Sequence, residues 1–272
     1  MDENENSLDE LVAAVQAGPH YRPISRELVR RIAAQELEKG RSWKETIKAI
    51  RNKLHQVGGA YQEAGIDYPR WLSELDGLPH SLEDPQVRDF CRRVMQQHAS
   101  TRERLPVLED FFAQALAPVA PVHSLLDLAC GLNPLALPWM PLAEGARYEA
   151  CDVYSDMVAF INRFFTHVGQ PGSADLCDLI DPPARPPVQV ALLLKTLPCL
   201  EQVDKAVGER LLDRIAAEHL MISFPAQGLG GRSKGMVQNY AHRFADLAAG
   251  RHWEIQRFEF ATELAFLVSK PA

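Results

Sequence analysis

The chain has 272 residues, of which 46% are hydrophobic and 24% charged, as in globular proteins. No apolar run is long enough to span a membrane, and we do not expect the acidic first residues to act as a secretory signal. Five dispersed cysteines without a Cys-x-x-Cys pair exclude a disulfide framework and a zinc ribbon; they fit a cytoplasmic protein that holds no metal. A net charge of −7 argues, taken alone, against a nucleic-acid partner.

Residues 1–97 are predicted to form an N-terminal helical domain. Ser42, followed three residues later by Glu45, is predicted to form a capping box at the start of a helix. Further helices are expected from about 84 to 97 and from 101 to 116. Three segments place apolar residues at helical spacing: Leu8, Leu11, Val12 and Val15; Ile24, Leu28, Ile32 and Leu37; Trp43, Ile47, Ile50 and Leu54.

This N-terminal region carries a concentration of positive charge. Between residues 20 and 55 there are ten Lys and Arg against four Glu, a local excess of six, whereas the segment before it has five acids and no base. A second basic stretch contains Arg232, Lys234 and Arg243. Two basic clusters in an acidic chain favour a polyanionic partner, although solvated helix faces are the alternative.

After Pro118 and Pro121 the pattern changes to alternating strands and helices. This alternation predicts a parallel sheet with right-handed crossovers, followed by a terminal antiparallel hairpin, and a second domain over residues 98–272. Helices are expected near 155–168 and 203–217. The candidate strands are 124–129, 147–153, 188–195 and 219–224, and the hairpin strands are 253–260 and 264–269.

The ends of these strands carry a candidate cofactor site. Cys130-Gly131 closes the first strand, and Asp152, 21 residues after Gly131, closes the second; Asp178 follows the next helix. Acids at these positions can hydrogen-bond the ribose and base of a nucleoside. The turn lacks the later glycines of Gly-x-Gly-x-x-Gly, which disfavours a dinucleotide and favours S-adenosylmethionine.

Three motifs make a family resemblance specific. Asp127-Leu-Ala-Cys-Gly-Leu-Asn-Pro-Leu-Ala, Leu192-Leu-Leu-Lys-Thr-Leu-Pro-Cys-Leu-Glu201 and the segment from Ser223-Phe-Pro to Leu229-Gly-Gly-Arg-Ser-Lys-Gly-Met236 are similar to the Arm/Rmt family. These are the 16S rRNA (guanine(1405)-N7)-methyltransferases associated with aminoglycoside resistance. The similarity extends to Arg51-Asn-Lys-Leu-His-Gln-Val-Gly-Gly-Ala-Tyr and Ser100-Thr-Arg-Glu-Arg-Leu, and so covers most of the chain from about His20.

The resemblance implies a fold, a reaction and a set of site residues. The fold is the α/β class I S-adenosylmethionine-dependent methyltransferase fold, Rossmann-like, preceded by a helical rRNA-binding domain. The reaction is methylation of guanine N7 in 16S rRNA within the 30S subunit, with aminoglycoside resistance as its consequence. The implied cofactor contacts are Arg104, near the methionine carboxylate, and Ala129, Gly131, Asp152, Asp178 and Leu179.

The remaining implied residues concern the substrate. Lys195 and Glu201 are expected at the mouth of the active site, although a surface ion pair between them is the alternative. Phe224, after the fourth strand, either stacks on a flipped base or packs in the core. The candidate RNA contacts are Arg22, Arg30, Arg31, Lys48, Arg51, Lys53, Arg232 and Lys234.

Guanine N7 needs no deprotonation, so no general base is expected, and rate must come from alignment of the reacting groups with water excluded. Two other functions stay open at this point. One is a small-molecule S-adenosylmethionine methyltransferase that uses its helical region as a lid. The other is a non-catalytic RNA-binding factor in ribosome assembly that retains a vestigial pocket.

Overall fold

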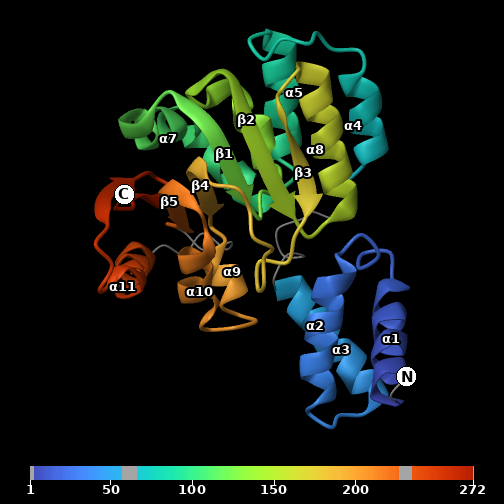
Figure 1. Ribbon diagram of the computed structural model, residues 1–272. Helices are drawn as coiled ribbons and strands as arrows, with labels where there is room; N and C mark the ends of the chain where they lie inside the picture. The colour runs from blue at the N-terminus through green and yellow to red at the C-terminus, as the bar shows by residue number, and fades with distance from the viewer. Residues whose placement is uncertain (1–2, 57–65, 227–234, 272) are drawn as a thin grey trace.

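A seven-stranded sheet forms the centre of the computed structural model, which describes residues 3–56, 66–226 and 235–271 (Figure 1). The strand order is β3-β2-β1-β4-β5-β7-β6. The first five strands are parallel, and β7 is antiparallel to β5 and β6. The strands are β1 (Val122–Leu128), β2 (Leu142–Asp152), β3 (Gly172–Leu176), β4 (Val188–Leu194), β5 (Ala217–Pro225), β6 (Glu254–Glu259) and β7 (Glu263–Ser269).

Alternating side chains of the central strands fill two separate cores, one on each face of the sheet. On β4, Val190 and Leu192 enter one core while Ala191 and Leu193 enter the other, as the two-residue period of a strand requires. The first core is covered by α4 (Tyr68–Leu75), α5 (Pro85–Met95), α7 (Leu108–Ala115), α8 (Ser155–Val168) and η4 (Asn133–Trp139). The second is covered by α9 (Leu197–Leu200), α10 (Val207–Arg214) and α11 (Met236–Ala248).

Three helices form a group of their own below the sheet in Figure 1, on the side toward which the β2 and β3 arrows point. They are α1 (Glu3–Gln16), α2 (Arg26–Leu37) and α3 (Trp43–Leu54), and they pack on one another. The predicted capping box is confirmed at the start of α3, where the Ser42 backbone N–H donates to Glu45 (3.2 Å).

The next two helices pack against the sheet layer, although they precede residue 98. The rings of Tyr68 and Trp71 on α4 each lie 5.5 Å from the ring of Phe160 on α8. Helix α5 packs on η4, where the Arg92 guanidinium lies 4.7 Å from the Trp139 ring centroid. Helices α4 and α5 thus cover the sheet although they precede residue 98. The domain boundary at residue 97 stays a prediction.

Most of the predicted helices and strands of the sheet region agree with the structure. The helix at 155–168, the four parallel strands and the terminal hairpin are confirmed. The helix expected at 101–116 is instead divided into α6 (Ala99–Arg104), η2 (Leu105–Val107) and α7, because Pro106 cannot donate a backbone hydrogen bond. The short edge strand β3 and helix α11 were missed. No helix among the described residues could span a membrane.

Candidate functional site

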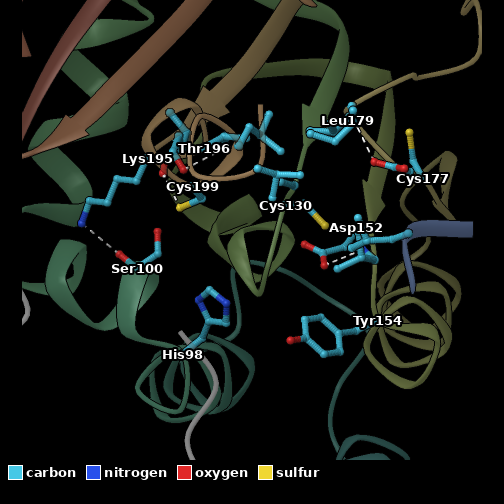
Figure 2. Close-up of a pocket in the computed structure, with 18 residues that line it drawn as sticks. His98, Ser100, Cys130, Asp152, Tyr154, Cys177, Leu179, Lys195, Thr196 and Cys199 are labelled. Atoms are coloured by element: carbon cyan, nitrogen blue, oxygen red, sulfur yellow. Dashed lines mark hydrogen bonds between the residues drawn. The ribbon is translucent and has the colours of Figure 1, made fainter. Parts of the chain in front are cut away.

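A pocket opens at the carboxyl ends of β1, β2 and β4. Figure 2 shows His98, Cys130, Asp152 and Lys195 arranged around its space. Ligands of parallel sheets bind at this edge. The lining residues are Leu28, His98, Ser100, Ala129, Cys130, Asp152, Val153, Tyr154, Cys177, Asp178, Leu179, Ile180, Leu194, Lys195, Thr196, Cys199, Leu200 and Val203.

The turn after β1 is held against the end of β2. The Gly131 backbone N–H donates to Asp152 Oδ2 (2.9 Å), and the Val153 N–H donates to Oδ1 (2.7 Å). Burial raises the pKa of Asp152, although the backbone hydrogen bonds oppose this rise. Ala129, which lines the pocket, holds a left-handed backbone with φ 52°, a strain typical of functional sites.

Two features of position 131 favour glycine: its left-handed backbone and the nearby His98 ring. Its φ is 52°, and an added Cβ would lie 2.8 Å from Cε1 of His98. His98 is buried and lines the pocket; burial, together with the nearby Arg104 and Lys195 cations, lowers its pKa to about 4. His98 is therefore a neutral imidazole at physiological pH.

A second carboxylate lines the pocket beyond β3. Asp178 is buried, and its Oδ1 accepts a hydrogen bond from the Ile180 backbone N–H (2.9 Å). Its Oδ2 accepts one from Nε of Arg31, a residue of α2 (2.7 Å). Leu179 is buried beside it and lines the same pocket. The structure thus brings Ala129, Asp152, Asp178 and Leu179 to one cavity, with Gly131 directly behind it.

A buried group of charges lies next to the pocket around Glu263 of β7. Arg104 donates to both carboxylate oxygens of Glu263, from Nε at 3.0 Å and from a terminal nitrogen at 2.8 Å. Lys195 Nζ lies 3.4 Å from Glu263 and donates to Glu103 at 2.7 Å. Burial opposes ionisation of Glu263, but the Arg104 and Lys195 cations lower its pKa. Lys195 lines the pocket, and these two carboxylates compensate its charge.

This group continues into the turn through Asn133. Arg104 donates to Asn133 Oδ1 (2.8 Å), and Asn133 Nδ2 donates to Asp127 (2.8 Å), which also accepts a hydrogen bond from the Tyr148 hydroxyl (2.7 Å). The asparagine that replaces a phosphate-binding glycine therefore ties η4 to β1. Arg104 is fully buried and is not among the residues that line the pocket, so its predicted contact with a methionine carboxylate stays a prediction.

Glu201 and Phe224 lie outside the pocket lining. Glu201 is paired with Arg243 of α11 (2.7 Å), so the alternative of a surface pair with Lys195 is wrong. Phe224 is buried and stacks on Tyr240 with ring centroids 5.0 Å apart, which supports the packing interpretation. A substrate role for either residue stays a prediction.

Four of the six predicted RNA contacts that the structure describes have partners within the chain, Arg31 among them. Arg30 pairs with Asp9, Lys53 with the buried Glu36, and Arg51 lies over the Tyr21 ring at 5.3 Å. By contrast, among the described residues no ion-pair or side-chain hydrogen-bond partner is found for Arg22 and Lys48, which are exposed. Arg232 and Lys234 lie outside the described residues.

Sequence reasoning missed several members of the site. Leu28, His98, Cys177 and Thr196 line the pocket, and Glu263 organises the charges beside it. His98 lies two residues before the Ser100-Thr-Arg-Glu-Arg-Leu motif, so the family resemblance does not include it. Glu263 begins an apolar strand, and nothing local distinguishes it from an exposed acid. Among the described residues, no cluster of histidine, cysteine or acidic side chains could hold a metal ion.

The fold and site together define a class. A sheet of this order with one antiparallel strand, and a pocket with two carboxylates at the carboxyl ends of its parallel strands, is the class I methyltransferase arrangement. The family model for "Ribosomal RNA methyltransferase (FmrO)" matches residues 18–267. The chain belongs to this family of ribosomal RNA methyltransferases, and the predicted fold is confirmed.

The similarity to individual relatives extends over nearly the whole chain. The 16S rRNA (guanine(1405)-N(7))-methyltransferase of Micromonospora echinospora is 35% identical over 98% of each chain. The enzyme of the same name from Serratia marcescens is 31% identical over 97% of this chain and 99% of its own. The crystal structure of the 16S rRNA methyltransferase RmtF in complex with S-adenosyl-L-homocysteine has a TM-score of 0.81 and 30% identity, covering both chains completely. The 16S rRNA methylase RmtB has a TM-score of 0.80 and 27% identity, over 97% of this chain and 98% of its own.

Proposed function

We propose that this protein methylates N7 of guanine 1405 in 16S rRNA, with S-adenosylmethionine as methyl donor and the assembled 30S subunit as substrate. The observation that carries the proposal is the extent of the family match, which begins at residue 18 and therefore includes α2 and α3. A small-molecule methyltransferase would need to share only the sheet and its pocket. Cytoplasmic location and aminoglycoside resistance follow from the same proposal.

The residues of the pocket fit the adenosine portion of this cofactor. Asp152 and Asp178 present ionisable oxygens at the ends of β2 and β3, and Leu28 and Leu179 provide apolar surface for a base. Hydroxyl and amine donors of a nucleoside complement such carboxylates. Bound there, the cofactor would supply a methyl group carried on a positively charged sulfur.

The protein's contribution to the reaction is alignment and exclusion of water. Guanine N7 carries a lone pair, so no side chain has to remove a proton before methyl transfer. A paired base must leave its helix to reach a pocket of this kind. The neutral His98 ring and the compensated Lys195 lie in the pocket, where they can contact the base without adding an uncompensated charge.

Methyl transfer to isolated subunits tests the proposal. The purified protein is incubated with tritium-labelled S-adenosylmethionine and 30S subunits, with 50S subunits and a mixture of small nucleosides as controls. We expect stoichiometric labelling of 16S rRNA in the 30S sample and none in the controls. Unlabelled 30S subunits, with a labelled small molecule instead, would favour the lid alternative. Failure to bind S-adenosylmethionine at all would favour the non-catalytic factor.

A further inference from the structure

One helix of the N-terminal group reaches the pocket directly. Leu28 of α2 is buried and is part of the pocket lining. Arg31 lies three residues further along α2 and so on the same side of the helix. It donates from Nε to Oδ2 of the pocket residue Asp178 (2.7 Å). The helix thus contributes an apolar surface to the pocket and a cation to one of its two carboxylates.

Backbone contacts fix this helix to the rim of the pocket. The Ser25 N–H donates to the Val153 carbonyl (2.7 Å), and the Ser155 N–H donates to the Pro23 carbonyl (2.8 Å). Ile24 forms an isolated antiparallel bridge with Tyr154. Val153 and Tyr154 themselves line the pocket. The start of α2 is therefore attached to the segment that follows Asp152, and the position of Arg31 is set by this attachment.

The Arg31 contact leaves Asp178 able to receive a ligand. An ionised carboxylate offers about four acceptor positions, and Asp178 uses one for the Ile180 N–H and one for Arg31. The Asp178 side chain is only 7% exposed, so a guanidinium at hydrogen-bond distance restricts its rotamer. An exocyclic amine of a base is the kind of donor that such an oxygen accepts.

The neighbouring arginine provides a natural contrast. Arg30 is adjacent in sequence but pairs with Asp9 of α1 through a bond at the exposed surface. It is not among the residues that line the pocket. Two adjacent arginines of α2 thus bind different partners. Arg30 contacts the N-terminal helix α1, and Arg31 contacts the pocket.

We propose that Arg31 is a cofactor-positioning residue, which holds Asp178 for the adenine end of S-adenosylmethionine, and that Leu28 completes the same pocket. This assignment replaces the phosphate contact predicted for Arg31, and it rests on the proposed function for the identity of the ligand.

Calorimetric titration of the full chain with S-adenosylhomocysteine, without RNA, tests the assignment. Arg31→Gln is expected to weaken binding roughly five- to tenfold, in the range of ordinary coupling effects, and Leu28→Ala is expected to weaken it independently of charge. The matched variant Arg30→Gln is expected to bind as the wild type does. In an Asp178→Asn background Arg31→Gln is expected to have no further effect, because Arg31 acts through Asp178.

The results that would overturn the role of Arg31 differ from those that would overturn the proposed function. Unchanged affinity for S-adenosylhomocysteine in Arg31→Gln, with reduced binding to 30S subunits, would make Arg31 an RNA contact and overturn the assignment. An equal additional loss in the Asp178→Asn background would also overturn it. If the wild type binds the ligand but leaves 30S subunits unmethylated, the proposed substrate is wrong, while the affinities still decide the role of Arg31.

Discussion

At the scale of residues, the conformation of the turn after β1 depends on two contacts of Gly131. The Gly131 N–H holds Asp152, while the absence of a Gly131 side chain leaves room for the His98 ring. Ala129 and Lys195, at the ends of adjacent strands, hold left-handed backbones although neither is glycine. Such strain costs about 1–3 kcal/mol at each position and persists only where surrounding contacts enforce it. The pocket edge is therefore preformed.

Gly131→Ala is predicted to weaken cofactor binding at least tenfold and to destabilise the fold. Its added Cβ would lie 2.8 Å from His98 Cε1, closer than packed carbon atoms approach, so the turn or the ring must move. Gly145→Ala is the matched control, because Gly145 also has a positive φ (71°) but nothing within 4 Å of an added Cβ. Calorimetry and thermal unfolding measure both effects. Equal losses in the two variants would show that backbone strain alone is responsible.

His98 is predicted to make the stability of the fold depend on pH in mildly acidic solution. Its pKa is about 4 in the folded protein and about 6.5 when exposed, so between these values the unfolded chain binds a proton that the folded chain does not. The stabilising effect is present above pH 6.5 and is lost as the pH falls toward 4.

Urea unfolding of the wild type and of His98→Asn over pH 7 to pH 4.5 measures this effect. We expect the free energy of unfolding of the wild type to fall more steeply, by about 1 kcal/mol per pH unit. Parallel pH profiles for the two proteins would contradict a neutral buried His98.

At the scale of elements, a buried acid organises the N-terminal helices. Glu36 of α2 is 1% exposed and is surrounded by Lys39, Arg41 and Lys53. Burial opposes its ionisation, but hydrogen bonds from Lys39 and Lys53 outweigh this and lower its pKa to about 2. Much of the basic excess noted in the sequence is therefore used to hold α2 and α3 together.

Glu36→Gln is predicted to lower the free energy of unfolding by about 1.5–3 kcal/mol at pH 7, because charge-assisted hydrogen bonds to a buried group are lost. The exposed Glu38 provides the control Glu38→Gln, which is expected to have no effect. Since the Glu36 pKa is lowered, its contribution is complete above pH 4.5 and is lost as the pH falls toward 2. Thermal unfolding at pH 7 and pH 3 measures this. Equal stability of the wild type and Glu36→Gln at pH 7 would contradict the role of Glu36.

At the scale of the whole molecule, two groups of elements meet at one pocket. The sheet supplies Asp152, Asp178 and Lys195, and the N-terminal helices supply Leu28 and the Arg31 contact. Exposed Arg22 follows Tyr21, whose ring contacts Arg51, and exposed Lys48 lies one turn before Arg51 on α3. The positive charges of Arg22 and Lys48 therefore lie near the contact between Tyr21 and Arg51, where they can bind phosphates.

Charge reversal of both positions, Arg22→Glu with Lys48→Glu, is predicted to weaken 30S binding by at least about tenfold in 0.1 M salt and to reduce its salt dependence. Affinity for S-adenosylhomocysteine should not change. The control is Arg163→Glu on α8, an exposed arginine that pairs with Asp76 at the end of α4. Subunit binding at several salt concentrations measures the effect. Full methylation of 30S subunits by the double variant with unchanged affinity would contradict an RNA contact here.

The sequence was sufficient where a function depends on a local pattern. The turn at Gly131 and the acid Asp152 lie at the ends of strands that period and composition reveal. Asp178 is placed only after the next helix, because the short edge strand β3 is not predicted. Glu263 could not be found in this way, because its importance depends on Arg104, 159 residues away. Arg31 was predicted as an RNA contact on charge alone, since nothing in the sequence of α2 shows that it faces Asp178.

The most direct test of the central claim is to locate the methyl group. After incubation with the protein and S-adenosylmethionine, 16S rRNA from 30S subunits is reduced with borohydride, cleaved with aniline and mapped by primer extension. We expect one new stop, at guanine 1405, which is absent with Asp152→Ala. Methylation without cleavage at that guanine, or no methylation of 30S subunits by a protein that binds the cofactor, would contradict it.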